Sequence, residues 1–179
     1  MKRNLAALAF ASVLLSSPAF AQSVGEETGV NSILGIAPTT EDFIREAATS
    51  DMLEIEAGKL AQFKGTPDEK KFAAAMIADH TKTSADLKSM IAGEMEAAIP
   101  VVLDGLSQKK LDKLRNTKPA NFPGEYDPMQ VRAHKDAVAL FERYAKDGDD
   151  PKLRAWAGTT LPTLQHHLEM AQAMDKDRQ

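Results

Sequence analysis

Apolar residues recur every three or four positions over four long stretches of the chain, which is the spacing of one buried helix face. The four stretches are 39–64, 66–93, 127–146 and 151–174. Proline and glycine interrupt this periodicity over residues 94–125, where one short helix at 107–115 is expected. Strand-like alternation is not seen. The pattern therefore predicts an all-α fold, a ferritin-like four-helix bundle at 39–176 in which two helical hairpins are joined by a long crossover.

Helix start signals support these boundaries. The sequence Thr66-Pro67-Asp68-Glu69 combines a capping residue, a proline in the first turn and a glutamate at the capping-box position. The sequence Asp127-Pro128-Met129-Gln130 repeats this logic, so Asp127 is expected to cap the third helix. Pro162 lies inside the fourth helix and is expected to kink it.

The first 21 residues have the features of a cleavable signal peptide. Lys2 and Arg3 precede an apolar run, and Ala19-Phe20-Ala21 has the Ala-x-Ala form of a cleavage site. Residues 22–38 are rich in small and polar residues without periodicity, and we interpret them as a flexible leader. An exported protein, most simply a periplasmic one, is expected, without a transmembrane segment after cleavage.

Composition narrows the range of functions. The chain has no cysteine, which excludes disulfides and thiol chemistry. Its formal net charge is −4 and it has no basic run, so a nucleic acid is not expected as a partner.

One ionisable residue lies near the middle of the apolar face of each predicted long helix. The four are Glu54, His80, His134 and His167. Counted from the hairpin turns, they lie at similar heights, so they are able to converge inside a bundle. Three neutral imidazoles and a carboxylate form a suitable site for one divalent transition metal ion such as zinc, copper, iron, manganese or nickel.

Four further polar residues lie near these positions along the helices. They are Asp51, Asp79, Thr83 and Thr163. Carboxylates and hydroxyls of this kind commonly hold metal-binding histidines through hydrogen bonds. We therefore expect them to surround the metal ligands.

Two other interpretations of the four central residues are open. They can instead form a buried hydrogen-bond network that fixes the helix register in a non-metal interaction module, with an unknown protein partner. They can also serve a redox metalloenzyme, which requires an open coordination position and access for a substrate. The sequence indicates no catalytic residue, so a non-enzymatic role is favoured.

Three segments of the chain resemble motifs of the family called domain of unknown function 4142. They are residues 54–61, 72–80 and 161–168, within a match that covers about 42–174. The resemblance implies an exported bacterial protein with a ferritin-like fold and matches the four central residues, but it implies no established activity. Ferritin-like di-iron sites use Glu-x-x-His, whereas Ile77 and Leu164 stand three residues before His80 and His167. A carboxylate-bridged di-iron centre is therefore not expected.

Overall fold

The computed structural model describes residues 23–178, so the predicted signal peptide lies outside the described residues. All regular elements within this range are helical, which confirms the all-α prediction. The four long helices are α3 (Thr40–Lys64), α4 (Pro67–Met90), α6 (Phe122–Asp147) and α7 (Pro151–Arg178). Among these described helices, none combines the length and the apolar character that crossing a membrane requires.

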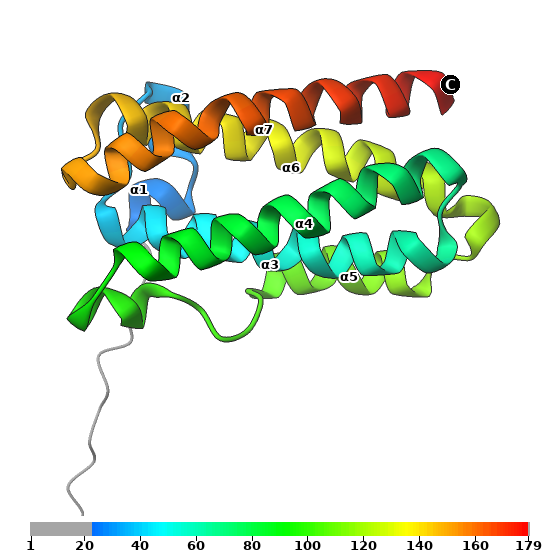
Figure 1. Cartoon of the computed structure of the whole chain (residues 1–179), viewed down its shortest axis with the longest axis horizontal. Coiled ribbons are helices and arrows are strands. Elements are labelled where there is room, and N and C mark those ends of the chain that lie inside the picture. The colour runs from blue at the N-terminus through cyan, green and yellow to red at the C-terminus, as the bar shows by residue number, and fades with distance from the viewer. Residues whose placement is uncertain (1–22, 179) are drawn as a thin grey trace, which may run out of the picture.

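The long helices lie side by side as two hairpins (Figure 1). Helix α3 packs mainly on α4, and α6 packs mainly on α7, while contacts between α4 and α7 and between α3 and α6 join the hairpins. Helices α4 and α6 begin at the same end of the molecule, which we call the Glu69 end (Figure 1). Helices α3 and α7 begin at the opposite end, which we call the Thr40 end. The crossover thus makes α6 run parallel to α4, as the long connection predicts.

Side-chain caps set the starts of the first hairpin's helices. The Thr39 hydroxyl accepts a hydrogen bond from the Asp42 backbone N–H at the start of α3. At the start of α4, Thr66 and Glu69 form both hydrogen bonds of a capping box. These contacts satisfy backbone donors that a helix cannot satisfy itself, and they fix where the helices begin.

The predicted start of the third helix is wrong. Helix α6 begins at Phe122, and both Asp127 and Pro128 lie inside it. Asp127 therefore does not cap the helix. It is instead buried, and its carboxyl group meets that of Glu69. The start signal in the sequence misled because core packing of Phe122 and Tyr126 holds a helical segment before Pro128, and this packing outweighs the backbone hydrogen bond that an interior proline removes.

The contact between these two carboxyl groups makes folding stability depend on pH. Burial, followed by the hydrogen bond and charge of Glu69, raises the pKa of Asp127 to about 7. An acid with a raised pKa in the folded protein binds a proton that the unfolded chain has released, so stability falls as pH rises from about 4 to about 7. Asp127→Asn is expected to remove this loss and to stabilise the protein by about 1–3 kcal/mol at pH 8. Urea unfolding at pH 5 and pH 8 tests this, and an equal effect of the substitution at both values would contradict it.

Residues 22–38 were predicted to lack regular structure, and the structure differs within the part it describes. Helices α1 (Val24–Glu27) and α2 (Val30–Leu34) are present there. The Arg143 guanidinium of α6 donates hydrogen bonds to the buried Glu26 carboxylate and to the Ile36 carbonyl oxygen. Such short helices carry no periodic signal, and the contact that holds them comes from a residue more than 100 positions away.

The crossover contains one regular α-helix, α5 (Gly105–Asn116), close to the predicted 107–115, and two short 3₁₀ helices, η1 (Gly93–Ala98) and η2 (Pro119–Asn121). The Asp104 side chain caps α5 by accepting hydrogen bonds from two backbone N–H groups. The Lys64 ammonium group donates to carbonyl oxygens of Leu114, Arg115 and Thr117. A cation placed on the carbonyl end of α5 docks the crossover onto the end of α3.

The apolar core consists of two parts with a polar layer between them. One cluster fills the Thr40 end and includes Phe43, Phe141 and Trp156. The second fills the Glu69 end and includes Phe72, Met76 and Phe122. The helix positions between these clusters carry the predicted central residues, so the fold places its least hydrophobic layer in the middle of the molecule.

Candidate metal centre

The polar layer is built around three histidines from three different long helices. His80 of α4, His134 of α6 and His167 of α7 are each about 98% or more buried. The ring centroids are 5.8 Å apart for His80 and His134, 5.6 Å for His80 and His167, and 5.5 Å for His134 and His167. One nitrogen from each ring lies within 4.8 Å of the other two. Such a group of imidazoles is able to hold a metal ion.

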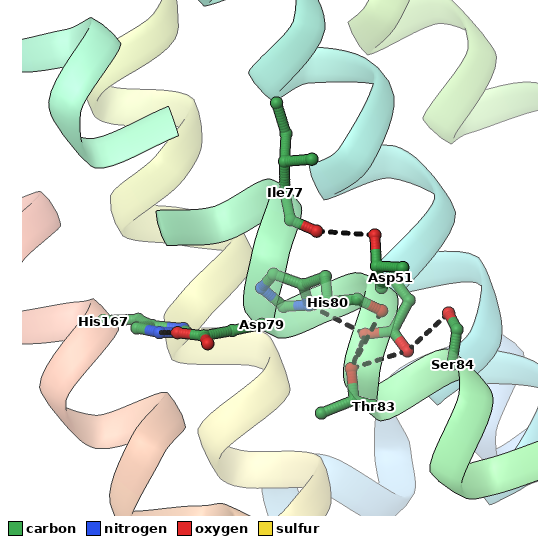
Figure 2. Close-up of polar contacts among 8 residues, drawn as sticks. Asp51, Ile77, Asp79, His80, Thr83, Ser84 and His167 are labelled. Carbon is green, nitrogen blue, oxygen red and sulfur yellow. Dashed lines mark hydrogen bonds and ion pairs between the residues drawn. The ribbon is translucent and has the colours of Figure 1, made fainter. Parts of the chain in front are cut away.

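His80 is held from outside the cluster by Asp51 of α3. The His80 Nδ1 atom lies 2.7 Å from an Asp51 carboxylate oxygen. The same carboxylate accepts hydrogen bonds from Thr83 at 2.9 Å and from Ser84 at 3.0 Å (Figure 2). Asp51 is buried, so its charge is satisfied by three donors rather than by water. This contact fixes both the orientation and the tautomer of the His80 ring.

The other two histidines are held in the same manner by different acceptors. His134 Nδ1 lies 2.9 Å from the backbone carbonyl oxygen of Gln130, one turn earlier in α6. His167 Nε2 lies 2.9 Å from a carboxylate oxygen of Asp79 (Figure 2). A carbonyl or carboxylate oxygen can only accept, so in each case the ring nitrogen carries the proton.

The proton positions leave each neutral ring with one unprotonated nitrogen. These atoms are Nε2 of His80, Nε2 of His134 and Nδ1 of His167, and all three are buried without a hydrogen-bond partner. A nitrogen lone pair needs a donor or a cation, and burial without either is costly. In their neutral forms, the three rings therefore provide three nitrogen lone pairs, and no ring donates a hydrogen bond to another.

Glu54 of α3 is the fourth buried residue of this layer. Its side chain is 1% exposed, and neither carboxylate oxygen has a hydrogen-bond partner. Its negative charge acts on both His80 and His134, where it favours the protonated ring. The compact group within 4.8 Å contains the three histidines, and Glu54 lies beside it as a further buried acceptor.

The surroundings shift the pKa values of the three histidines in different directions. Burial lowers the pKa of His167 to about 4, despite its hydrogen bond to Asp79. Burial likewise lowers the pKa of His134, against the opposing charge of Glu54. Burial also acts to lower the pKa of His80, but the hydrogen bond and charge of Asp51 outweigh it and raise that pKa above its ordinary value. At neutral pH, His134 and His167 are thus held in the uncharged form that a metal ion binds.

Three of the four residues predicted to surround the histidines make hydrogen bonds at this centre. Asp51 and Asp79 each accept a hydrogen bond from a central histidine, and Thr83 supports Asp51. Thr163 does not belong to this group, because it is exposed on α7, outside the buried stripe that carries His167. The prediction that Thr163 surrounds the ligands stays a prediction, and its exposure on α7 does not favour it.

Sequence reasoning missed two contacts at this centre. Ser84 adds a donor to Asp51, and the backbone of Gln130 orients His134. Ser84 lies four residues after His80, so helical spacing could have predicted that the two side chains lie on the same face of α4. The acceptor for His134 is a backbone carbonyl oxygen, which every residue has, so the sequence could not have indicated Gln130.

The donor set resembles the chemistry of a transition-metal site more than that of an alkaline-earth site. It provides three imidazole nitrogens and one adjacent carboxylate, whereas magnesium and calcium prefer oxygen ligands. Oriented histidines with a carboxylate or carbonyl behind each ring are the usual arrangement around a bound metal ion.

Comparison with known proteins identifies the family to which the chain belongs. Searches against curated proteins and against solved structures found no match. Residues 25–174, which include all four long helices almost completely, match the family model described as a domain of unknown function, DUF4142. The chain therefore belongs to the family called domain of unknown function 4142.

Proposed function

We propose that this protein is a ferritin-like four-helix bundle that binds one divalent transition metal ion in its core. His80, His134 and His167 are the proposed ligands, with Glu54 as the fourth ligand or as the charge that neutralises the ion. The proposed role is metal handling or protection of the envelope under stress, in the periplasm, and not turnover of a defined substrate.

The observation that carries this proposal is the set of buried lone pairs that have no donor. Three imidazole nitrogens and both oxygens of Glu54 lack hydrogen-bond partners in a layer that is closed to solvent. Each unsatisfied buried polar atom costs about 1–3 kcal/mol, so several together require a compensating group. A divalent cation compensates all of them at once, because every free atom is an electron-pair donor.

The alternative, a purely structural network, fits these contacts less well. A network that fixes helix register needs donors matched to acceptors. Asp51 and Asp79 provide such matches on the outside of the ring cluster, whereas the three inner nitrogens and both Glu54 oxygens have none. The nearest unpaired donors on α6, the Gln130 amide and the Tyr126 hydroxyl, are also without partners. The satisfied outer contacts support orientation of the rings, and the unsatisfied inner atoms support a bound cation.

The metal content of the purified protein tests the proposal directly. We expect protein purified without chelator to contain close to one equivalent of a transition metal, and the His80→Ala/His167→Ala variant to contain none. Elemental analysis makes the measurement. His166→Ala is the matched control, because that neighbouring side chain is 67% exposed and should leave the metal content unchanged.

Circular dichroism separates loss of the site from loss of the fold in the double variant. The proposal is wrong if the unsubstituted protein takes up no zinc, cobalt, copper, iron, manganese or nickel even after reconstitution. It is also wrong if the folded double variant retains the same metal content as the unsubstituted protein. Either result would return the four central residues to a structural role.

A further inference from the structure

The buried polar atoms without partners are distributed unevenly along the molecule. Besides the histidines, within residues 23–178 they belong to Glu54, Glu69, Tyr126, Asp127 and Gln130, and to Ser23 beside α1. Glu69, Tyr126, Asp127 and Gln130 lie on the Glu69 side of the histidine layer, whereas Glu54 lies within that layer. Apolar and aromatic side chains fill the core on both sides of this layer, but the unpaired polar atoms are found among them on the Glu69 side.

Helix register connects these atoms into one series. Tyr126, Gln130 and His134 follow one another at intervals of four residues, so they share a face of α6 at steps of about 6 Å. Burial raises the pKa of Tyr126 well above its ordinary value, and the charges of Glu54, Glu69 and Asp127 raise it further. Along α6, Tyr126 lies between the end of the molecule and Gln130, and its hydroxyl is buried without a hydrogen-bond partner.

A cavity of about 570 Å³ lies at the outer end of this series. Glu69 and Asp127 line it, and each is at least 98% buried. Their carboxyl groups meet, and Asp127 Oδ2 also lies 3.6 Å from Arg178 Nε. The ionisable residues that line the cavity are Asp68, Glu69, Lys71, Asp127, Asp177 and Arg178. Carboxyl groups outnumber cationic groups in this lining, so the cavity favours cations.

The aromatic side chain of Phe72 lies between the cavity and the histidine layer. Phe72 lines the cavity, and its ring centroid lies 6.0 Å from that of His134 and 6.3 Å from that of Tyr126. A phenylalanine ring can rotate without breaking a hydrogen bond. Phe72 therefore reaches from the cavity to the histidine layer, within the apolar cluster that also contains Met76 and Phe122.

We propose that a divalent cation reaches and leaves the three-histidine centre through the cavity at the Glu69 end, past Phe72 and along Tyr126, Gln130 and Glu54. This proposal rests on the proposed metal-binding function. Oxygen atoms of Glu69 and Asp127 receive the ion first, and the Tyr126 hydroxyl and Gln130 amide oxygen replace part of its hydration shell. Glu54 then transfers the ion to the imidazoles. Oxygen donors of moderate strength along the way let an ion move on to the stronger nitrogen ligands.

The rates of metal binding test this route independently of the affinity. Cobalt(II) is the probe, because its visible absorption reports its arrival at the histidines. An equilibrium titration of the full-length protein gives the affinity, and stopped-flow absorbance with a chelator chase gives the association and dissociation rates. Phe72→Leu is expected to raise both rates about tenfold, equivalent to about 1.4 kcal/mol in the barrier, with the affinity little changed. Glu69→Gln/Asp127→Asn is expected to slow association by a similar factor.

Asp150→Asn is the matched control, because Asp150 lines the cavity at the Thr40 end and its replacement keeps a side-chain oxygen to cap Leu153. We expect this variant to bind and release cobalt at unchanged rates. Unchanged rates in both Glu69-end variants, or a change confined to Asp150→Asn, would overturn the route while leaving the metal site in place. Absence of cobalt binding in the unsubstituted protein would overturn the metal site itself, and the route with it.

Discussion

Glu54→Gln is expected to stabilise the metal-free protein and to weaken metal binding at the same time. The Glu54 carboxylate is buried, neither of its oxygens has a hydrogen-bond partner, and its charge acts on His80 and His134. The amide has nearly the same shape, carries no charge and supplies two N–H donors. Removing an uncompensated buried charge should raise the free energy of unfolding by about 1–4 kcal/mol. Loss of the same charge should reduce metal affinity at least tenfold.

Urea unfolding in the presence of chelator and a metal titration of the same preparation measure the two effects. A structural role for Glu54 predicts the opposite sign, because removal of the acceptor from three imidazoles would then cost several kcal/mol. Destabilisation of the metal-free protein by Glu54→Gln would therefore favour the non-metal alternative. A variant that merely disturbs the fold would lose both stability and metal affinity, so a gain in stability with a loss of affinity would point to the charge of Glu54.

Asp51→Asn is expected to weaken the proposed metal binding about 10- to 100-fold, through its contact with the proposed ligand His80. The buried carboxylate fixes the ring of His80 and makes its free nitrogen a stronger electron-pair donor. The asparagine keeps an acceptor for His80 but loses the charge and presents an N–H₂ group towards Thr83 or Ser84. We also expect it to lower the free energy of unfolding by about 1–3 kcal/mol.

Asp79→Asn provides the comparison within the same centre. Asp79 makes the equivalent contact with His167, but its side chain is 46% exposed. Solvent screens this charge, so the loss of affinity should be clearly smaller than for Asp51→Asn. Isothermal titration of both variants with zinc makes the comparison. Equal losses would contradict the idea that burial of Asp51 gives the contact its strength.

The sequence was sufficient to place the four central residues in the core. Each lies in a stripe of apolar residues at helical spacing, and a single polar residue in such a stripe must face the interior wherever the helix packs. The Thr66 and Glu69 capping signals also located the start of α4 correctly. These features depend on positions within one helix, which is why they can be read without knowledge of the partners.

Other features depend on contacts between distant segments, and the sequence did not reveal them. Asp127 has the pattern of a helix cap, and only the proximity of Glu69 explains why it is buried in the middle of α6 instead. Helices α1 and α2 depend on the contact between Glu26 and Arg143. Which nitrogen of each histidine faces inward was also hidden, because it is set by acceptors on neighbouring turns and helices.

The division of the chain into two hairpins has a consequence for assembly. The α3–α4 hairpin carries Glu54 and His80, and the α6–α7 hairpin carries His134 and His167, so neither half holds a complete centre. The exposed residues Val101 and Val102 lie in the segment that connects them. A chain cut at this point would yield two fragments that each contribute half of the electron-pair donors. With the proposed metal site, association of the fragments would be coupled to metal concentration, and the ion would act as a cross-link between two halves of one protein.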